Sequence, residues 1–349
     1  MQGIRVNGRG NAWPVFVGKT HPFYKRKSED LSNASYSLIS FKGNDINYNN
    51  IRWEVLIDAG HHTVPYIIQN ENRIPEAIFI THAHLDHTLG IDWIAQSYHY
   101  TVNKEKPYPV YCTKQVFQII LSSYPHLLKI IEHKELIPGI TTQVDEVDQL
   151  RVTAYPVYHG ISGVGASMLL FDIHENNAVK SSLFTGDLIC PLLRESDYDK
   201  IAGAACIYID TNNRYPYPES NHGSFTSLSP DGEKSEHLVN WLNRIDFSDL
   251  LSPHKDLDTD KLIHPYFYEL LEEKLHPSDM ICSVCDFIVK TRIKNVNLVH
   301  YGGMEDKAFY NEEILTEKKL ETWAGKILKQ QGLNNTEVHV SKTGDFNKL

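Results

Sequence analysis

The sequence feature that most constrains the fold is a run of metal-ligand residues directly after a predicted strand. Residues 81–87 include His82, His84, Asp86 and His87, and they follow the apolar run 77–80, which is typical of a buried strand. Imidazole nitrogens and carboxylate oxygens are the usual protein ligands of zinc and similar divalent metals. A spacing of two along an extended chain places His82 and His84 on one side. A turn would then bring Asp86 and His87 to a second position, so we expect a metal site rather than an ordinary polar loop.

Three more ligand-type residues lie where other predicted strands end. His159 follows a strand at 152–158, Asp187 follows one at 183–185, and His300 follows one at 297–299. Small residues beside each of them let the backbone and a metal come close. A single strand-end histidine is more often an ordinary structural residue, but four strand-end sites in order indicate one shared metal site.

Composition limits the class of protein. The chain has 349 residues, 41% of them hydrophobic, and a net charge of −10, which suits one large domain or two small ones with a packed core. The acidic balance disfavours a broad nucleic-acid footprint. The beginning of the chain has no apolar signal region, and there is no apolar run of membrane-spanning length, so we expect a cytoplasmic protein without a membrane segment.

The five cysteines are scattered, as expected in a reducing cytoplasm. Cys282 and Cys285 form a lone CxxC motif. Because a partner pair is missing, we expect ordinary thiols rather than a redox or zinc site.

The order of predicted elements indicates an α/β (α+β) fold in which helices cover sheets. The pattern predicts helices at 116–131 and 312–332 and a mainly helical stretch at 232–292. The predicted strands are at 4–6, 34–40, 53–57, 77–80, 109–112, 150–157, 167–173, 182–185, 206–209 and 297–299.

Taken together, the pattern HxHxDH, then His, then Asp, then His resembles the metallo-β-lactamase superfamily of dinuclear metal hydrolases. The resemblance covers roughly residues 1–310 and implies a four-layer αβ/βα sandwich. It implies one domain at 1–310, with a helical insertion at about 232–292. A helical extension at 311–349 would pack on the same domain.

The resemblance also assigns the ligands of two divalent metal ions. It places His82, His84 and His159 on the first ion, Asp86, His87 and His300 on the second, and Asp187 as a bridge between them. Asp58 matches the family's strand-end aspartate, which orients ligands. Zinc fits this set, as do manganese and iron.

A further segment, Asn221-His222-Gly223, resembles the extra-histidine position of the tRNase Z and cyclic phosphate phosphodiesterase branch. The loop at 8–15 resembles that branch too, and a similarity to the pyrroloquinoline quinone biosynthesis B protein is weaker. The branch implies that His222 is a general acid or phosphate contact, although an ordinary loop histidine is an equal alternative. It also implies that Asp86 shuttles a proton while it binds a metal.

These features predict a metal-dependent phosphodiesterase for a small cyclic nucleotide or cyclic sugar phosphate, acting through a metal-bridging hydroxide. An acyl hydrolase, such as a lactonase or thioesterase, is one alternative, and a non-hydrolytic metal-binding accessory protein is another. The expected partner is the small-molecule substrate rather than a nucleic acid or membrane, and a homodimer is left open. Tyr215, Tyr217, Phe225 and Tyr301 are candidates for an aromatic wall around a base or sugar, although packing is the commoner role of such residues.

Overall fold

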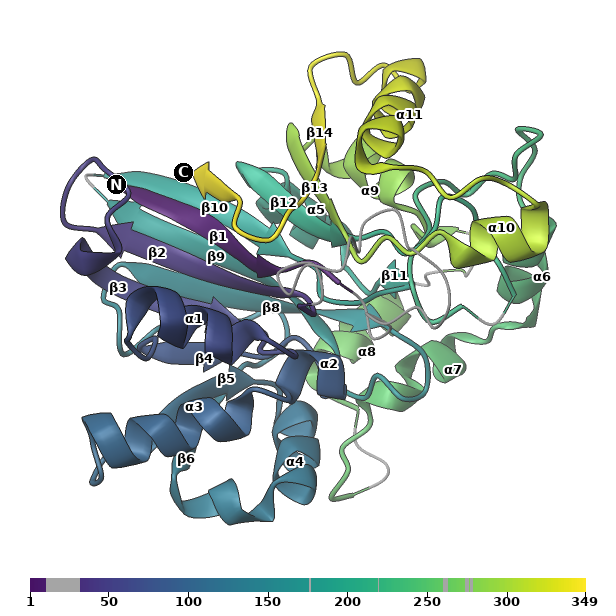
Figure 1. Ribbon diagram of the computed structural model, residues 1–349. Coiled ribbons are helices and arrows are strands. Elements are labelled where there is room, and N and C mark those ends of the chain that lie inside the picture. Colours follow the sequence, from purple (N-terminus) through teal and green to yellow (C-terminus); the bar gives the residue numbers. More distant parts are fainter. Residues whose placement is uncertain (11–31, 176, 219, 260–262, 274–275, 277–278) are drawn as a thin grey trace. The chain divides into compact units, whose positions relative to one another are not determined.

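The computed structural model describes residues 1–10, 32–175, 177–218, 220–259, 263–273, 276 and 279–349 (Figure 1). The chain forms two compact units. Unit 1 comprises Met1–Leu136, Gln143–Leu150 and Ser341–Leu349, and unit 2 comprises Ile137–Thr142 and Arg151–Val340. The part of the predicted 8–15 loop beyond Gly10 lies outside the described residues.

Unit 1 contains a seven-stranded mixed sheet in the order β15-β1-β2-β3-β4-β5-β6. Strands β15 to β3 pair antiparallel, whereas β3, β4, β5 and β6 run parallel. The strands are β1 (Gln2–Gly8), β2 (Ser35–Phe41), β3 (Ile51–Ile57), β4 (Ala77–Phe79), β5 (Tyr108–Cys112), β6 (Ile131–Glu135) and β15 (Phe346–Lys348).

Helices pack against the parallel part of this sheet, where β3, β4 and β5 are mostly apolar and buried at consecutive positions. Leu56, Ile78 and Val110 share one core cluster with apolar residues of α1, α3 and α4, as expected when one sheet face is buried. The helical segments of unit 1 are α1 (Thr63–Glu71), α2 (Leu85–Thr88), α3 (Ile91–Ser97) and α4 (Lys114–Ser123), with short turns η2 (Tyr48–Asn50), η3 (Tyr98–Val102) and η4 (Pro125–Lys129).

The larger sheet has eight strands in the order β11-β8-β9-β10-β12-β13-β14, with β7 paired to β8. Within it, β10, β12, β13 and β14 run parallel. These strands lie in unit 2, apart from Gln143 of β7 and Leu150 of β8. They are β7 (Thr141–Gln143), β8 (Leu150–Tyr158), β9 (Ser167–Glu175), β10 (Ala178–Phe184), β11 (Cys190–Pro191), β12 (Cys206–Asp210), β13 (Asn295–Val299) and β14 (Glu337–Val340).

A second apolar cluster holds the helical part of unit 2 together. It joins Leu238 and Leu242 of α6, Leu250 and Leu251 of α7, and Phe267 of α8. The helical segments of this unit are α5 (Glu195–Ile201), α6 (Glu236–Arg244), α7 (Phe247–Leu251), η5 (Ser252–His254), α8 (Pro265–Glu272), α9 (Val284–Thr291), α10 (Met304–Tyr310) and α11 (Glu317–Gln330). None of the described helices has the length and apolar character needed to cross a membrane.

The predicted helix at 116–131 is wrong in its second half. Helix α4 ends at Ser123, Pro125 begins a 3-10 turn, and Ile131 already belongs to β6. Proline lacks an N–H donor and restricts the residue before it, so the helix could not continue. The prediction was wrong because the apolar residues 127, 128, 130 and 131 have the spacing of a helix face.

A buried histidine makes the stability of unit 2 depend on pH. His254 is 3% exposed, and its Nε2 lies 3.0 Å from the Val157 carbonyl oxygen, to which it donates. Burial lowers its pKa to about 4. The unfolded chain therefore binds more protons between that value and the ordinary histidine pKa of about 6.5. Stability should fall as pH drops through this window, by about 3 kcal/mol from this group.

Denaturant unfolding at about pH 7 and about pH 4.5 would measure this loss. The His254→Gln variant keeps an N–H donor for Val157 but does not titrate, so its stability should fall less than that of the wild type. An equal fall in both proteins would contradict the assignment to His254.

Candidate metal centre

In unit 1, the carboxylate of Asp58 forms hydrogen bonds with residues that follow β4. Asp58 directly follows β3, and β4 is the parallel neighbour of β3, so the ends of the two strands meet at one sheet edge. Asp58 Oδ1 accepts from the Thr81 amide at 2.8 Å, and Oδ2 accepts from the Thr81 hydroxyl at 2.8 Å. Asp58 Oδ2 also lies 2.8 Å from His87 Nδ1. The backbone of Asp58 has a positive φ of 55°, an uncommon conformation that typically persists where function requires it.

This carboxylate orients two imidazoles. The Thr81 hydroxyl donates its proton to Asp58, so its oxygen must accept from His82 Nδ1, which lies 3.1 Å from Thr81 Oγ1. His87 Nδ1 donates to Asp58 directly. Both rings therefore carry their proton on Nδ1, and Nε2 is the nitrogen with a lone pair for a metal.

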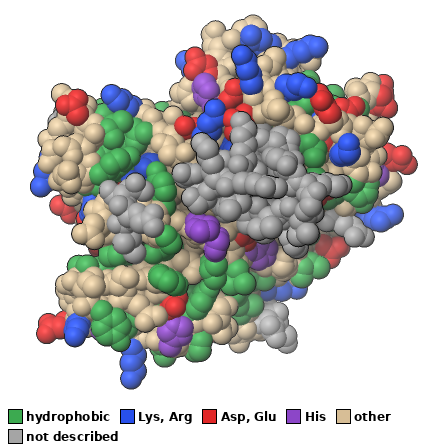
Figure 2. Space-filling view, in the orientation of Figure 1, with side chains coloured by type: hydrophobic (Ala, Val, Ile, Leu, Met, Phe, Trp, Pro, Cys, Tyr) green, Lys and Arg blue, Asp and Glu red, His purple; other side chains and the backbone are tan. Residues whose placement is uncertain are grey.

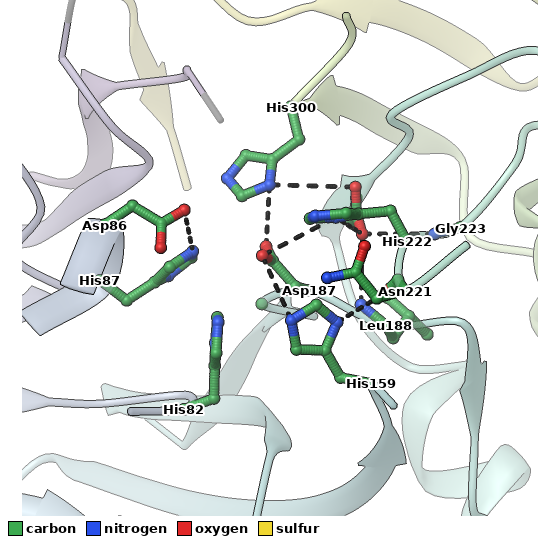
Figure 3. A network of polar contacts seen from close by, with 12 residues as sticks. His82, Asp86, His87, His159, Asp187, Leu188, Asn221, His222, Gly223 and His300 are labelled. Carbon is green, nitrogen blue, oxygen red and sulfur yellow. Dashed lines mark hydrogen bonds and ion pairs between the residues drawn. The ribbon is translucent and has the colours of Figure 1, made fainter. Parts of the chain in front are cut away.

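The other two predicted ligands of unit 1 lie close to these rings. The ligand atoms of His82 and His84 are within 4.8 Å of each other, and Asp86 Oδ2 is 3.6 Å from His87 Nε2 (Figure 3). The chain turns at His84, which is extended, into the one-turn helix α2. Gly60 makes this packing possible, since a Cβ there would lie 2.0 Å from the Asp86 carbonyl oxygen.

In unit 2, Asp187 lies among three imidazoles. Its Oδ1 is 2.8 Å from His300 Nδ1, and its Oδ2 is 3.7 Å from both His159 Nε2 and His222 Nδ1 (Figure 3). Asp187 follows β10 and His300 follows β13, two parallel strands flanking β12. The sheet order thus explains why residues more than a hundred positions apart meet at one edge.

Asp210 is a site residue that the sequence analysis missed. It ends β12, is fully buried, and its Oδ2 lies 2.9 Å from His222 Nδ1. The same oxygen accepts from the Leu188 amide at 3.2 Å and the Gly223 amide at 3.4 Å. The ligand atoms of Asp187, Asp210, His222 and His300 lie within 4.8 Å of one another. The sequence signal for Asp210 is an aspartate at the end of an apolar strand, which is also the signal for Asp58.

His159 is oriented by backbone rather than by a carboxylate. It follows β8, is fully buried, and its Nδ1 lies 2.5 Å from the Asn221 carbonyl oxygen. Donation from Nδ1 to that carbonyl leaves the lone pair on Nε2, the nitrogen nearest Asp187. The loop at 220–223 therefore positions both His159 and His222.

A buried ion pair braces the loops after β12 and β13. Arg214 Nε lies 3.1 Å from Asp306 Oδ2, and Asp306 also accepts from the backbone amides of Arg214 and Tyr215. Burial raises the pKa of Asp306, and Arg214 counteracts part of that rise. The amides of Gly302 and Gly303 donate to the Asn212 carbonyl at 2.9 and 3.0 Å. These contacts hold His300 in place relative to β12.

Three of the four candidates for an aromatic wall are packing residues. Tyr215 and Phe225 contact Trp323, and the hydroxyl of Tyr301 is directed at Asp306. Tyr217 alone of the four lines a described pocket. All five cysteines are buried free thiols.

The comparisons with known proteins concern the family and the fold. Residues 53–213 match the family model described as "Beta-lactamase superfamily domain", so this stretch of the chain is a β-lactamase superfamily domain and the predicted superfamily is confirmed. The match is narrower than the predicted 1–310. No curated protein matches the chain.

Solved structures extend the similarity over the whole chain. A diphosphatase from the PhnP family has a TM-score of 0.61 at 12% identity, covering 100% of this chain and 98% of that one. The metallo-β-lactamase fold protein YhfI from Bacillus subtilis has a TM-score of 0.54 at 10% identity, covering 99% and 98%. Human tRNase Z, short form, has a TM-score of 0.50 at 13% identity, covering 100% and 99%. The predicted metallo-β-lactamase fold is thereby confirmed.

Proposed function

We propose that this chain is a dinuclear metal-dependent hydrolase that acts on a small phosphodiester. The donor set consists of imidazole nitrogens and carboxylate oxygens, a combination that fits zinc, manganese or iron. In each unit, buried hydrogen bonds fix the protonation of ligand histidines, as metal-binding histidines require. The residues present therefore fit the metals that the superfamily implies.

The proposed ligands keep the assignment that the superfamily resemblance gives. By that resemblance, one ion would be held by His82, His84 and His159, the other by Asp86, His87 and His300, and both by Asp187. When bound, two divalent ions would supply an activated water and stabilise the negative charge that develops on oxygen. Asp58 keeps His82 and His87 in the binding tautomer, and Asp86 is proposed to shuttle a proton as well.

The observation that carries the choice of a phosphodiester is the Asp210–His222 pair. Asp210 accepts from His222 Nδ1 at 2.9 Å and so stabilises the protonated imidazole, while Nε2 is the nitrogen from which a proton can be given away. A buried carboxylate behind a half-buried imidazole is the arrangement of a general acid. Breaking an alkyl phosphodiester requires one, because the leaving alkoxide is a strong base.

The distribution of surface charge supports a small substrate. Lys and Arg side chains on the visible face are interspersed with Asp and Glu (Figure 2), and the net charge is −10. A nucleic-acid polymer would favour a continuous basic surface. Two of the structural neighbours are named as a diphosphatase and a tRNase, which supports phosphate ester chemistry for this fold.

The His222→Ala variant tests the proposal through leaving-group dependence. On a phosphodiester with an alkoxide leaving group, kcat should fall by about 100-fold. On bis(p-nitrophenyl) phosphate, whose phenolate leaves without a proton, the loss should be much smaller. Steady-state kinetics of both substrates with the metal-loaded protein measure the two ratios.

The matched control is His339→Ala, which removes an exposed histidine of the same unit and should leave both rates unchanged. Turnover of thioesters or lactones without turnover of any phosphodiester would contradict the proposed substrate. Equal losses of His222→Ala on both diesters would contradict the general-acid role.

A further inference from the structure

The described residues that line a pocket beside His222 all belong to unit 2. The pocket has a volume of about 430 Å³ including its open mouth, and Tyr217, His222, His237, Leu238 and Trp241 are among the residues that line it. Trp241 and His237 are four residues apart on α6, so the helix presents both side chains on one face.

The two large aromatic walls are held in place from behind. The Tyr217 ring stacks on Phe309 with centroids 5.7 Å apart and an interplanar angle of 17°. Its hydroxyl is hydrogen-bonded to Ser220 and Asn212, and burial raises its pKa to about 12, so it stays neutral. The Trp241 ring packs on Tyr158 at 6.1 Å and 30°. Preorganised rings lose little entropy when a ligand contacts them.

The described lining residues include none of Asp, Glu, Lys or Arg. No lysine or arginine among these residues could pair with a phosphate or carboxylate, so the aromatic part of the pocket suits a neutral group. Polar atoms are present nonetheless, because Ser220, Ser224 and His237 are part of the lining. Aromatic walls with a few hydrogen-bonding groups match a planar ring that has polar edges.

We propose that this pocket binds the nucleobase of a nucleoside phosphodiester on the leaving-group side. The inference rests on the proposed function and names its substrate class. Since the general acid His222 is part of the pocket wall, the group held there is the one whose oxygen takes the proton. The bond from phosphorus to the nucleoside oxygen breaks, and a bond from phosphorus to a water oxygen forms. The proton that water loses balances the proton that His222 donates.

Binding of free adenosine to the metal-loaded full chain tests the pocket without any turnover. Saturation-transfer NMR would measure the affinity in wild type, Trp241→Ala, Trp241→Phe and Trp93→Ala. Trp241→Ala should bind at least about fivefold more weakly, because stacking on one ring is lost. Trp241→Phe keeps an aromatic face and should retain most of the affinity. Trp93 is 64% exposed in unit 1, and its loss should change nothing.

Product analysis with adenosine 5′-methyl phosphate then assigns the side of the bond. The proposal predicts adenosine and methyl phosphate rather than AMP and methanol. Unchanged adenosine affinity in Trp241→Ala, or release of AMP, would overturn the inference while leaving a phosphodiesterase intact. Adenosine binding that depends on Trp241, without hydrolysis of any diester, would instead overturn the proposed function and leave the pocket standing.

Discussion

Asp187→Asn is expected to lower kcat/KM by about 1,000-fold and to reduce the number of metal ions bound per chain. Asp187 is 2% exposed, and its oxygens lie 2.8 to 3.7 Å from nitrogens of His159, His222 and His300. The substitution keeps the size of the side chain but removes the negative charge that would offset the two proposed cations. A loss of several kcal/mol in charge stabilisation corresponds to this fold-change.

Elemental analysis of the purified variant and steady-state kinetics at saturating metal separate the two effects. The matched control is Asp172→Asn, on β9 of the same unit, where the carboxylate accepts from Ser181 at 2.5 Å. It should keep full metal content and activity. Wild-type activity in Asp187→Asn would remove this residue from the site, since a bridging carboxylate cannot be replaced by a neutral amide at no cost.

Much of the candidate site was predictable because its residues follow strands. His159 and His300 come directly after a predicted strand and Asp187 comes two residues after one, and the carboxyl ends of parallel strands meet at one edge of a sheet. The close HxHxDH spacing needed only a turn, which α2 supplies at Leu85. The assignment of these residues to a metal therefore depended on local patterns that a single sequence displays.

Other features depended on contacts between distant segments. Asp210 is a single acidic residue at the end of β12. Its partner, His222, is identified only by the folded structure, in which the loop at 220–223 contacts Asp210. The Asn221 carbonyl that orients His159 is a backbone group and leaves no trace in the sequence. Strand β15 pairs with β1 from the opposite end of the chain, and no local pattern indicates such a pairing.

Both units contain an aspartate at the end of a strand that accepts a hydrogen bond from a histidine, although the segments differ in sequence. Asp58 directly follows β3 and accepts from His87, and Asp210 ends β12 and accepts from His222. In each case a strand-end carboxylate fixes the proton of an imidazole on Nδ1. In the proposed function the two roles differ, because the first pair would present a metal ligand and the second a proton donor. The same substitution should therefore have different consequences in each.

Asp58→Asn is expected to weaken metal binding by about 100-fold. The amide has one acceptor oxygen, which the Thr81 amide uses, and its NH₂ group then faces the Thr81 hydroxyl and His87 Nδ1. His87 must become an acceptor at Nδ1, which moves its proton to Nε2 and removes the lone pair from the metal. The Thr81 hydroxyl turns toward His82, so the second ring loses its binding tautomer too. Asparagine tolerates the positive φ of this position, which keeps backbone strain out of the comparison.

Metal titration monitored by calorimetry measures the affinity, and nitrogen-15 NMR of the metal-free protein reports the tautomers of His82 and His87. Asp92→Asn is the matched control in the same unit, because Asp92 also pairs with a histidine, His126, at 2.7 Å, but on the surface. That variant should bind metal as the wild type does. A loss of affinity in Asp58→Asn with both tautomers unchanged would mean that the carboxylate acts through its charge alone. Unchanged affinity would show that Asp58 supports only the fold of the β3–β4 edge.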